Sequence, residues 1–510
     1  MWTRRAAAAL CLGAALAGPA GAEQPLSAID WLSDSVSEPD TAALPRGADD
    51  VHGAAPEEIS VTALDGPRLD AVGLLPPAVT GLPADTWGDS DTDELVRLIQ
   101  AKRAPRLPAT ARLLYTLLLA ELDPPAGSEE DGRLLLARLD TLLALGALDQ
   151  AQALLERAGP TNAQLFRRWF DVSLLTGHED RACAAMRAAP DIAPTFPARI
   201  FCLARGGDWN AALLTLDTAK ALGFVTEAED ALLIRFLDPE LFEGEPPLPV
   251  PTHPSPLVFR MFEAIGEALP TTTLPVAFAQ SDLRFTAGWK ARIEAAERLA
   301  RSGAIDENRL LGIYTERMPA ASGGVWDRVE AVQAFDVAML SGDPGAVARA
   351  LPPAWAAMEE AGLEVPFAAL YGERLARLPL ADVPRALAFR IALLSNSYEL
   401  IAATHDPATP QEAFLAGLAK GDVSGLEPPT PAAAALAEAF AGAEPPPQLS
   451  ALLERGRLGE ALLNAIALIG TGAVGDLGDL TAGVALLRAV GLEDVARRAA
   501  LQIVILEPTA

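Results

Sequence analysis

The chain contains 510 residues, of which 50% are hydrophobic, and it carries a formal net charge of −28 at pH 7. A chain of this length and composition can bury large hydrophobic cores, which favours more than one domain or one elongated array. The strong negative charge opposes binding to nucleic acid, to anionic lipid and to phosphate-rich ligands.

The first 22 residues have the three parts of a secretory signal peptide. Arg4 and Arg5 form a basic start, residues 6–18 form an uncharged apolar run, and small residues precede the end at Ala22. The apolar run is too short for a permanent membrane anchor, so we expect general secretion with cleavage after Ala22. The chain has only four lysines and is rich in Ala, Leu and Pro, which is typical of a GC-rich bacterial genome. We therefore expect a periplasmic protein without stable membrane insertion.

Residues 23–90 differ in composition from the rest of the chain. Pro, Gly and Asp interrupt the segment, although its Leu and Val content is too high for plain disorder. The stretch LSAIDWLSDSV (26–36) could form one short helix. We interpret the remainder as an extended arm along the first repeats, with Asp91 and Glu94 capping the helix that follows.

A turn with one spacing recurs along the chain, most regularly within residues 91–242. In each copy, a Gly between two Leu- and Ala-rich runs is followed five residues later by an Ala. The first three glycines lie 31 and 30 residues apart, and a fixed period of this size indicates a repeat architecture. The five pairs are Gly146 and Ala151, Gly177 and Ala182, Gly207 and Ala212, Gly456 and Ala461, and Gly491 and Ala496.

The apolar spacing on both sides of this turn predicts two antiparallel helices. Gly can adopt the left-handed conformation that ends the first helix, and we expect Asp149 or Asp180 to cap the second. Gln152 stands at capping-box spacing from Asp149. The Ala lies where the two helices approach closely. Because each hairpin leaves one apolar face uncovered, we expect successive hairpins to stack.

The turn GDWNAA (207–212) resembles the bend of the tetratricopeptide repeat, which places Gly-Asp-aromatic-x-x-Ala between its two helices. The family period is about 34 residues, and the Trp and Tyr landmarks of its first helix are mostly missing here. Pattern and resemblance together predict an all-α fold, an α-solenoid of antiparallel helix-turn-helix repeats with an extended, largely non-helical N-terminal arm. The resemblance also implies that Trp209 packs at the bend. A globular helical bundle with coincidental turns is the alternative.

Proline-rich segments divide the chain further. The predicted organisation is a signal peptide (1–22), the arm (23–90), tetratricopeptide-like repeats (91–242), a Pro-rich linker (243–256), a second helical block (257–405), a Pro-rich connection with short helices (406–448) and C-terminal helical repeats (449–510).

Cys183 and Cys202 are the only cysteines that remain once the signal peptide is removed. If residues 188–197 reverse the chain between antiparallel helices, the two side chains face each other and can form a disulfide in an oxidising compartment. Such a bond contributes on the order of 3 kcal/mol. Two buried thiols with different neighbours are the alternative. No histidine stands at ligand spacing, so we expect no metal site.

The sequence predicts no catalytic residue and no cofactor. GTGAVG (470–475) matches the dinucleotide-binding pattern, but a repeat helix precedes it and too few residues follow for a nucleotide-binding sheet. We interpret it as a glycine-rich loop between helices. His52, His178, His253 and His405 are scattered and expected in solvated loops, and no nucleophile elbow, Walker loop or His-Glu-x-x-His motif occurs.

These patterns predict a non-enzymatic, secreted repeat protein that holds a protein partner on the concave face of its solenoid. The leading hypothesis is a scaffold or assembly factor of a cell-envelope system, for example a flagellar motor or a secretion apparatus. The alternative is a peptidoglycan-binding protein similar to soluble lytic transglycosylases, which carry Ala-rich helical hairpins ahead of a catalytic domain. No separate catalytic domain follows the helices here. A small-molecule carrier that uses the gap between helical blocks is a third hypothesis.

Overall fold

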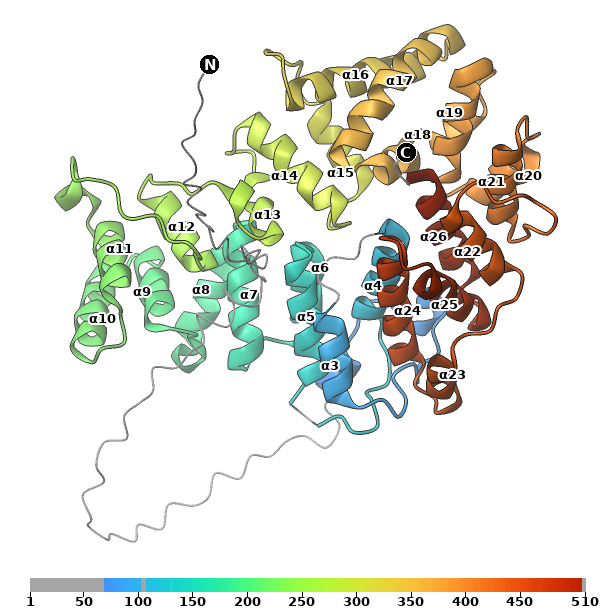
Figure 1. The fold of residues 1–510 in the computed structure, drawn as a ribbon. Helices are drawn as coiled ribbons and strands as arrows, with labels where there is room; N and C mark the ends of the chain where they lie inside the picture. Colours follow the sequence, from blue (N-terminus) through green and yellow to red (C-terminus); the bar gives the residue numbers. More distant parts are fainter. Residues whose placement is uncertain (1–67, 102–106, 130, 161, 507–510) are drawn as a thin grey trace, which may run out of the picture.

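The computed structural model describes residues 68–101, 107–129, 131–160 and 162–506 (Figure 1). These residues form 25 α-helices, α2 to α26, and five short 3-10 helices, with no β-strand among them. Most helices contact their neighbours in sequence. The predicted all-α fold with serially paired helices is therefore confirmed.

Seven helices, α5 to α11, form a row in which each helix contacts the next. The row runs from the centre of Figure 1 to its left end, where α10 and α11 lie. Because consecutive helices pair, the segment is a series of hairpins and not a bundle around one centre. The helices are α5 (Arg133–Ala144), α6 (Leu148–Ala158), α7 (Ala163–Thr176), α8 (Glu179–Ala188), α9 (Phe196–Arg205), α10 (Trp209–Ala221) and α11 (Glu227–Leu237).

The recurring Gly and Ala occupy equivalent places in these hairpins. All five glycines have φ between 70° and 83°, a left-handed conformation that a residue with a Cβ rarely adopts. All five alanines are fully buried. At the first turn, a Cβ on Gly146 would also collide with Leu299, which lies on a helix far along the chain. The spacing thus encodes both the turn and the close helix contact.

The capping interactions predicted for two of these turns are wrong. Neither Asp149 nor Asp180 accepts a hydrogen bond from the N-terminus of its helix. Asp149 instead pairs with Arg309 at 3.2 Å, and Asp180 pairs with Arg205 at 2.7 Å. Each helix begins earlier than the spacing predicts, so Asp149 and Asp180 lie inside the first turn instead of at the N-cap, which is Ala147 or His178.

Gln152 also departs from its predicted role, because it donates to Glu156 one turn further along the same helix. Asp91, by contrast, caps α3 (Thr92–Gln100) by accepting from the backbone N–H of Glu94 at 3.0 Å.

A second group of helices lies above the row in Figure 1. After α11 the chain turns back, and both α12 and α13 contact α7. The row therefore does not continue as one open superhelix to the C-terminus. This group comprises α12 (Pro256–Ala264), α13 (Ala279–Asp282), α14 (Trp289–Arg301), α15 (Glu307–Tyr314), α16 (Val325–Ser341), α17 (Pro344–Ala361), α18 (Glu364–Ala376), α19 (Asp382–Leu393) and α20 (Tyr398–Thr404).

The C-terminal helices return to the start of the array. Both α24 and α26 contact α4 (Pro108–Leu119), and α24 also contacts α3. A buried hydrogen bond joins the two ends: the backbone N–H of Ala109 donates to the side chain of Gln502 at 2.9 Å. The helices of this part are α21 (Pro410–Lys420), α22 (Pro431–Phe440), α23 (Pro447–Glu454), α24 (Leu458–Gly472), α25 (Leu477–Ala489) and α26 (Glu493–Leu506).

Residues 68–90 fasten the first helices to the last ones. They contain only a 3-10 turn (Leu69–Ala71) and one short helix, α2 (Pro77–Thr80). Trp87 is fully buried beside Gly459 of α24, whose backbone N–H donates to the carbonyl of Thr86 at 2.7 Å. The segment therefore packs between the first and the last helices and joins the two ends of the array. The predicted signal peptide, the predicted short helix at 26–36 and His52 lie outside the described residues.

Candidate functional site

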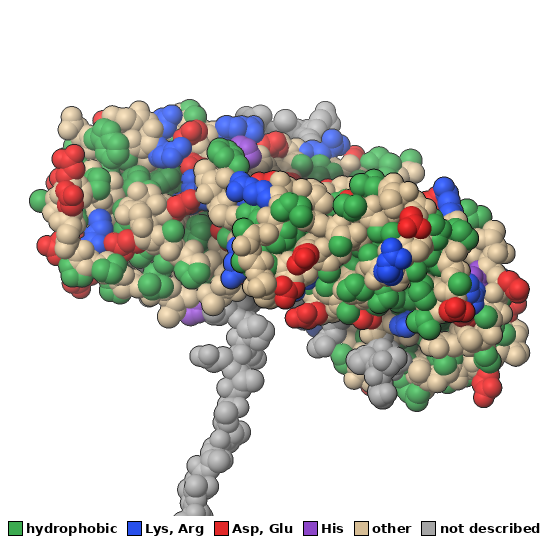
Figure 2. Space-filling view, turned by 90° about the horizontal axis from the view of Figure 1, so that it is seen from above, with side chains coloured by type: hydrophobic (Ala, Val, Ile, Leu, Met, Phe, Trp, Pro, Cys, Tyr) green, Lys and Arg blue, Asp and Glu red, His purple; other side chains and the backbone are tan. Residues whose placement is uncertain are grey.

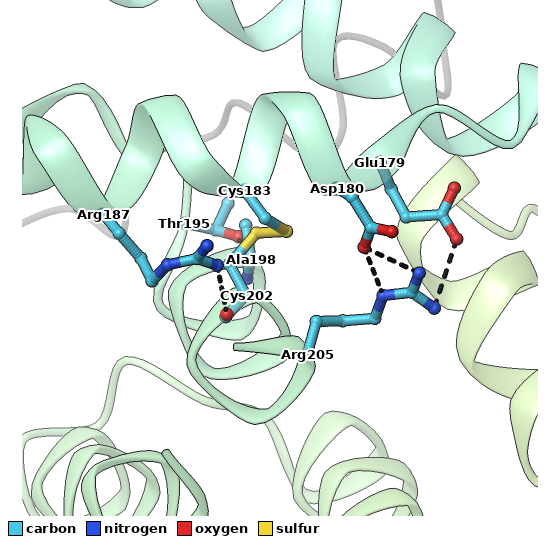
Figure 3. The surroundings of a disulfide bond; sticks show 8 residues. All are labelled: Glu179, Asp180, Cys183, Arg187, Thr195, Ala198, Cys202 and Arg205. Atoms are coloured by element: carbon cyan, nitrogen blue, oxygen red, sulfur yellow. Dashed lines mark hydrogen bonds and ion pairs between the residues drawn. A yellow bond between two sulfur atoms is a disulfide. The ribbon is translucent and has the colours of Figure 1, made fainter. Parts of the chain in front are cut away.

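A disulfide joins the two antiparallel helices α8 and α9. Cys183 and Cys202 are bonded, and their Cα atoms lie 4.9 Å apart (Figure 3). Thr195 caps α9 by accepting from the backbone N–H of Ala198, which fixes where this helix starts. Arg187 of α8 donates to the carbonyl of Cys202 at 3.3 Å. The antiparallel helices α8 and α9, which precede α10, are therefore held together at several points along their length.

Replacing both cysteines by serine is expected to lower the free energy of unfolding by about 3 kcal/mol. The reason is that the bond closes a loop between residues separated by 19 positions, which restricts the unfolded chain. Urea unfolding of the wild type and of the Cys183→Ser, Cys202→Ser variant measures the difference. A reductant should destabilise the wild type equally and leave the variant unchanged. Free thiols in the untreated wild type, detected by alkylation and mass spectrometry, would contradict this expectation.

Ion pairs connect this hairpin to the overlying helices. Arg205 of α9 pairs with Asp180 and, at 3.4 Å, with Glu179 of α8 (Figure 3). Glu179 is buried and also binds Arg260 of α12 at 2.7 Å. Arg260 in turn pairs with Glu263 on its own helix. These ion pairs hold α12 against α8 and connect α8 to α9, the helix that precedes α10.

Helix α10 has a defined start and an exposed outer face. Asp208 caps it by accepting from the backbone N–H of Ala211 at 3.1 Å, and Ala212 is fully buried against the row. The prediction that Trp209 packs at the bend is wrong, because 48% of its surface is exposed. Helix α10 contacts both α9 and α11, but these contacts leave about half of the Trp209 side chain exposed.

Large exposed apolar side chains gather around this end of the row. Leu213 and Leu214 of α10 are 47% and 69% exposed. Acidic and hydrophobic side chains intermingle at the left end of the molecule in Figure 2. An exposed cluster of this kind marks an interaction site more often than isolated surface residues do. We define the α10 face as Trp209, Leu213, Leu214, Leu222 and Phe224.

The sequence held a signal for this face that the helix pattern obscured. In the run from Trp209 to Ala221, polar residues such as Asp217 and Lys220 are mixed with apolar ones, so no single apolar side is apparent. A surface helix normally has one continuous apolar side that it buries. In α10, Ala212, Leu216 and Ala219 are buried, whereas Leu213 and Leu214 face solvent.

A buried charge cluster lies further back in the row, between α5 and α7. Arg168 binds the carboxylate of Asp140 with two hydrogen bonds, the longer at 2.8 Å. Asp171, one turn further along α7, is buried, and one of its carboxylate oxygens has no hydrogen-bond partner among the described residues. Burial raises the pKa of Asp171 from 3.8 to about 7, although Arg167 and Arg168 act in the opposite direction.

Asp171→Asn is expected to stabilise the protein above pH 7, by on the order of 2 kcal/mol. Because the folded-state pKa of Asp171 lies above its ordinary value, the folded protein binds one more proton than the unfolded chain between these two values. The contribution of this carboxyl group to stability therefore falls as the pH rises from about 4 to about 7. Urea unfolding at pH 5 and pH 8 should show a clearly larger benefit of the substitution at the higher pH. An equal benefit at both values would contradict the assignment.

Other candidate sites from the sequence do not assemble into a reactive centre. GTGAVG is not a complete loop as predicted, because Gly470 to Gly472 belong to α24. Part of it lines a cavity of about 340 Å³ between the start of α22, the turn from α24 to α25 and the end of α26, and no titratable side chain lines this cavity. A dinucleotide fingerprint needs a strand before the turn, and the described residues contain none.

His405 is also not a solvated loop residue. It stacks on Phe389 and contacts the carboxylate of Glu412 at 2.9 Å. His178 and His253 are exposed. Among the described residues, no three His, Cys, Asp or Glu side chains come together in a way that could hold a metal ion.

No protein-family model, curated protein or solved structure matches the chain. None of the described helices combines the length and apolar composition needed to cross a membrane.

Proposed function

We propose that this chain is a secreted, tetratricopeptide-like repeat protein that binds another protein and assembles it within the bacterial cell envelope. The observation that carries the proposal is the α10 face, where large apolar side chains remain exposed at the end of an otherwise well-packed row. A monomeric soluble protein gains nothing in stability from such a cluster, whereas a binding protein uses it as the core of an interface.

Two further observations support the proposal. The Cys183–Cys202 disulfide is compatible with an oxidising compartment, as the predicted signal peptide requires. The disulfide and the ion pairs from Glu179 and Arg205 hold α8 and α9, the two helices before α10, together. A rigid base favours binding because less conformational entropy is lost when the partner docks.

Affinity capture from a periplasmic extract tests this function. The full mature chain, immobilised through its C-terminus, should retain a specific protein over a range of salt concentrations. The same preparation is sedimented with purified peptidoglycan sacculi. Retention of the chain by sacculi without capture of any protein would contradict the proposal and favour wall binding.

A further inference from the structure

The α10 face lies near the end of the row, where α10 and α11 are found at the left of Figure 1. Helix α10 contacts both α9 and α11. After α11 the chain turns back, and α12 contacts α7. Leu213 and Leu214 of α10 nevertheless remain exposed, so α9 and α11 leave one side of this helix open to solvent.

The exposed side chains of α10 have the spacing of a helix-binding surface. Trp209 and Leu213 lie one turn apart, and Asp217 and Ala221 continue the same stripe at intervals of four residues. Leu214 widens the stripe next to Leu213. Residues at this spacing share one side of a helix, so a partner helix can lie along them.

The segment that contains the stripe is strongly acidic. Residues 206–250 contain nine acidic side chains and two basic ones. Both basic groups are already paired, Lys220 with Asp230 and Arg235 with Glu267, each at 2.7 Å. Asp217, which lies on the stripe itself, is exposed and has no ion-pair partner among the described residues. Positive charge on a ligand therefore complements this face.

We infer that the α10 face binds an amphipathic helix of a partner protein whose apolar stripe is flanked by Lys or Arg. This inference rests on the proposed function and names the class of partner. The partner helix packs on Trp209, Leu213 and Leu214, which α9 and α11 leave exposed. Its basic residues meet Asp217.

Charge excludes the two other occupants that the chain itself offers. A second copy would place one acidic end against another, which like-charge repulsion opposes. Residues 23–67 of the same chain contain ten acidic residues and one Arg, so they lack the required charge as well. A basic segment of another protein is the occupant that fits.

A pair of synthetic helical peptides tests the inference on the full mature chain. The basic peptide contains two tandem copies of Leu-Lys-Lys-Leu-Leu-Lys-Leu, and the acidic peptide replaces every Lys by Glu. Fluorescence anisotropy at physiological ionic strength should show saturable binding of the basic peptide alone. The Trp209→Ser, Leu213→Ser variant should bind it at least about tenfold more weakly.

Matched variants separate this site from general attraction to an acidic protein. Val337→Ser with Leu340→Ser removes a more exposed apolar pair from α16 and should leave affinity unchanged. Asp217→Lys should weaken binding of the basic peptide and favour the acidic one. Circular dichroism and thermal unfolding establish that each variant is folded.

Two results would overturn the inference: undiminished binding by the α10 variant, or equal binding of the acidic peptide to the wild type. Either result leaves the proposed function standing if affinity capture still yields a specific protein. Loss of capture together with intact peptide binding would instead contradict the proposed function.

Discussion

Arg138→Leu should lower the free energy of unfolding by about 3–5 kcal/mol, the largest loss expected from one charged residue. Arg138 is fully buried, and its guanidinium donates to the carbonyls of Leu118, Val72 and Ala120, each at 2.8 Å. A longer bond reaches the carbonyl of Asp70. Burial lowers the pKa of Arg138 to about 10, so the group stays charged at neutral pH. Leucine would leave these carbonyls buried without donors.

The matched control for this substitution is Arg157→Leu. Arg157 is about half exposed and pairs with Glu121 at 3.1 Å, so its loss should change stability by less than about 1 kcal/mol. Urea unfolding followed by circular dichroism measures both variants under one set of conditions. Similar small losses for the two substitutions would show that Arg138 does not hold residues 68–75 onto the array.

Trp87→Ala should cost about 3–5 kcal/mol, because it opens a cavity between the first and the last helices. Trp87 is fully buried, and a Cβ on Gly459 would overlap its ring. Gly459→Ala should therefore destabilise the wild type. It should be much better tolerated in the Trp87→Ala background, where the ring is absent.

Gly470→Ala provides the control for this pair. It lies in the same helix, α24, and no atom would come within 4 Å of its added Cβ. Alanine should therefore leave stability unchanged or raise it by about 0.5–1 kcal/mol. Thermal unfolding of the wild type, Trp87→Ala, Gly459→Ala and the double variant gives the coupling between Trp87 and Gly459. Additive losses would contradict a direct contact between the two ends of the array.

The hairpin turns were predictable from the sequence because their information is local. A Gly such as Gly177 permits a left-handed turn, and an Ala such as Ala182 permits a close helix contact, whatever the rest of the chain does. A window of six residues contains both the Gly of the turn and the Ala of the close helix contact. The left-handed glycines and fully buried alanines follow the pattern in all five turns.

Features set by distant residues could not be predicted in the same way. Asp149 pairs with Arg309, which lies on a helix 160 residues further along the chain, and the spacing of the turn gives no sign of this partner. The closure of the array depends on a bond between Ala109 and Gln502, which are 393 residues apart. A single sequence contains no pairing signal over that distance.

The candidate site shows the same division between local and distant information. The cap at Asp208 and the buried Ala212 follow from the local motif. The exposure of Trp209 does not, because it depends on how α11 and the chain beyond it lie relative to α10 in space. Arg138, which interrupts an apolar run in α5, was a visible signal of a buried polar contact, but its carbonyl partners were not identifiable.

Photo-cross-linking in living cells tests the central claim most directly. A photoreactive amino acid is placed at Leu214 on the α10 face or, as a control, at Leu340 on α16, in the full-length chain. We expect a discrete protein adduct from the first position that disappears when Trp209→Ser and Leu213→Ser are added. No adduct from Leu214, or the same adduct from Leu340, would contradict partner binding at the end of the row.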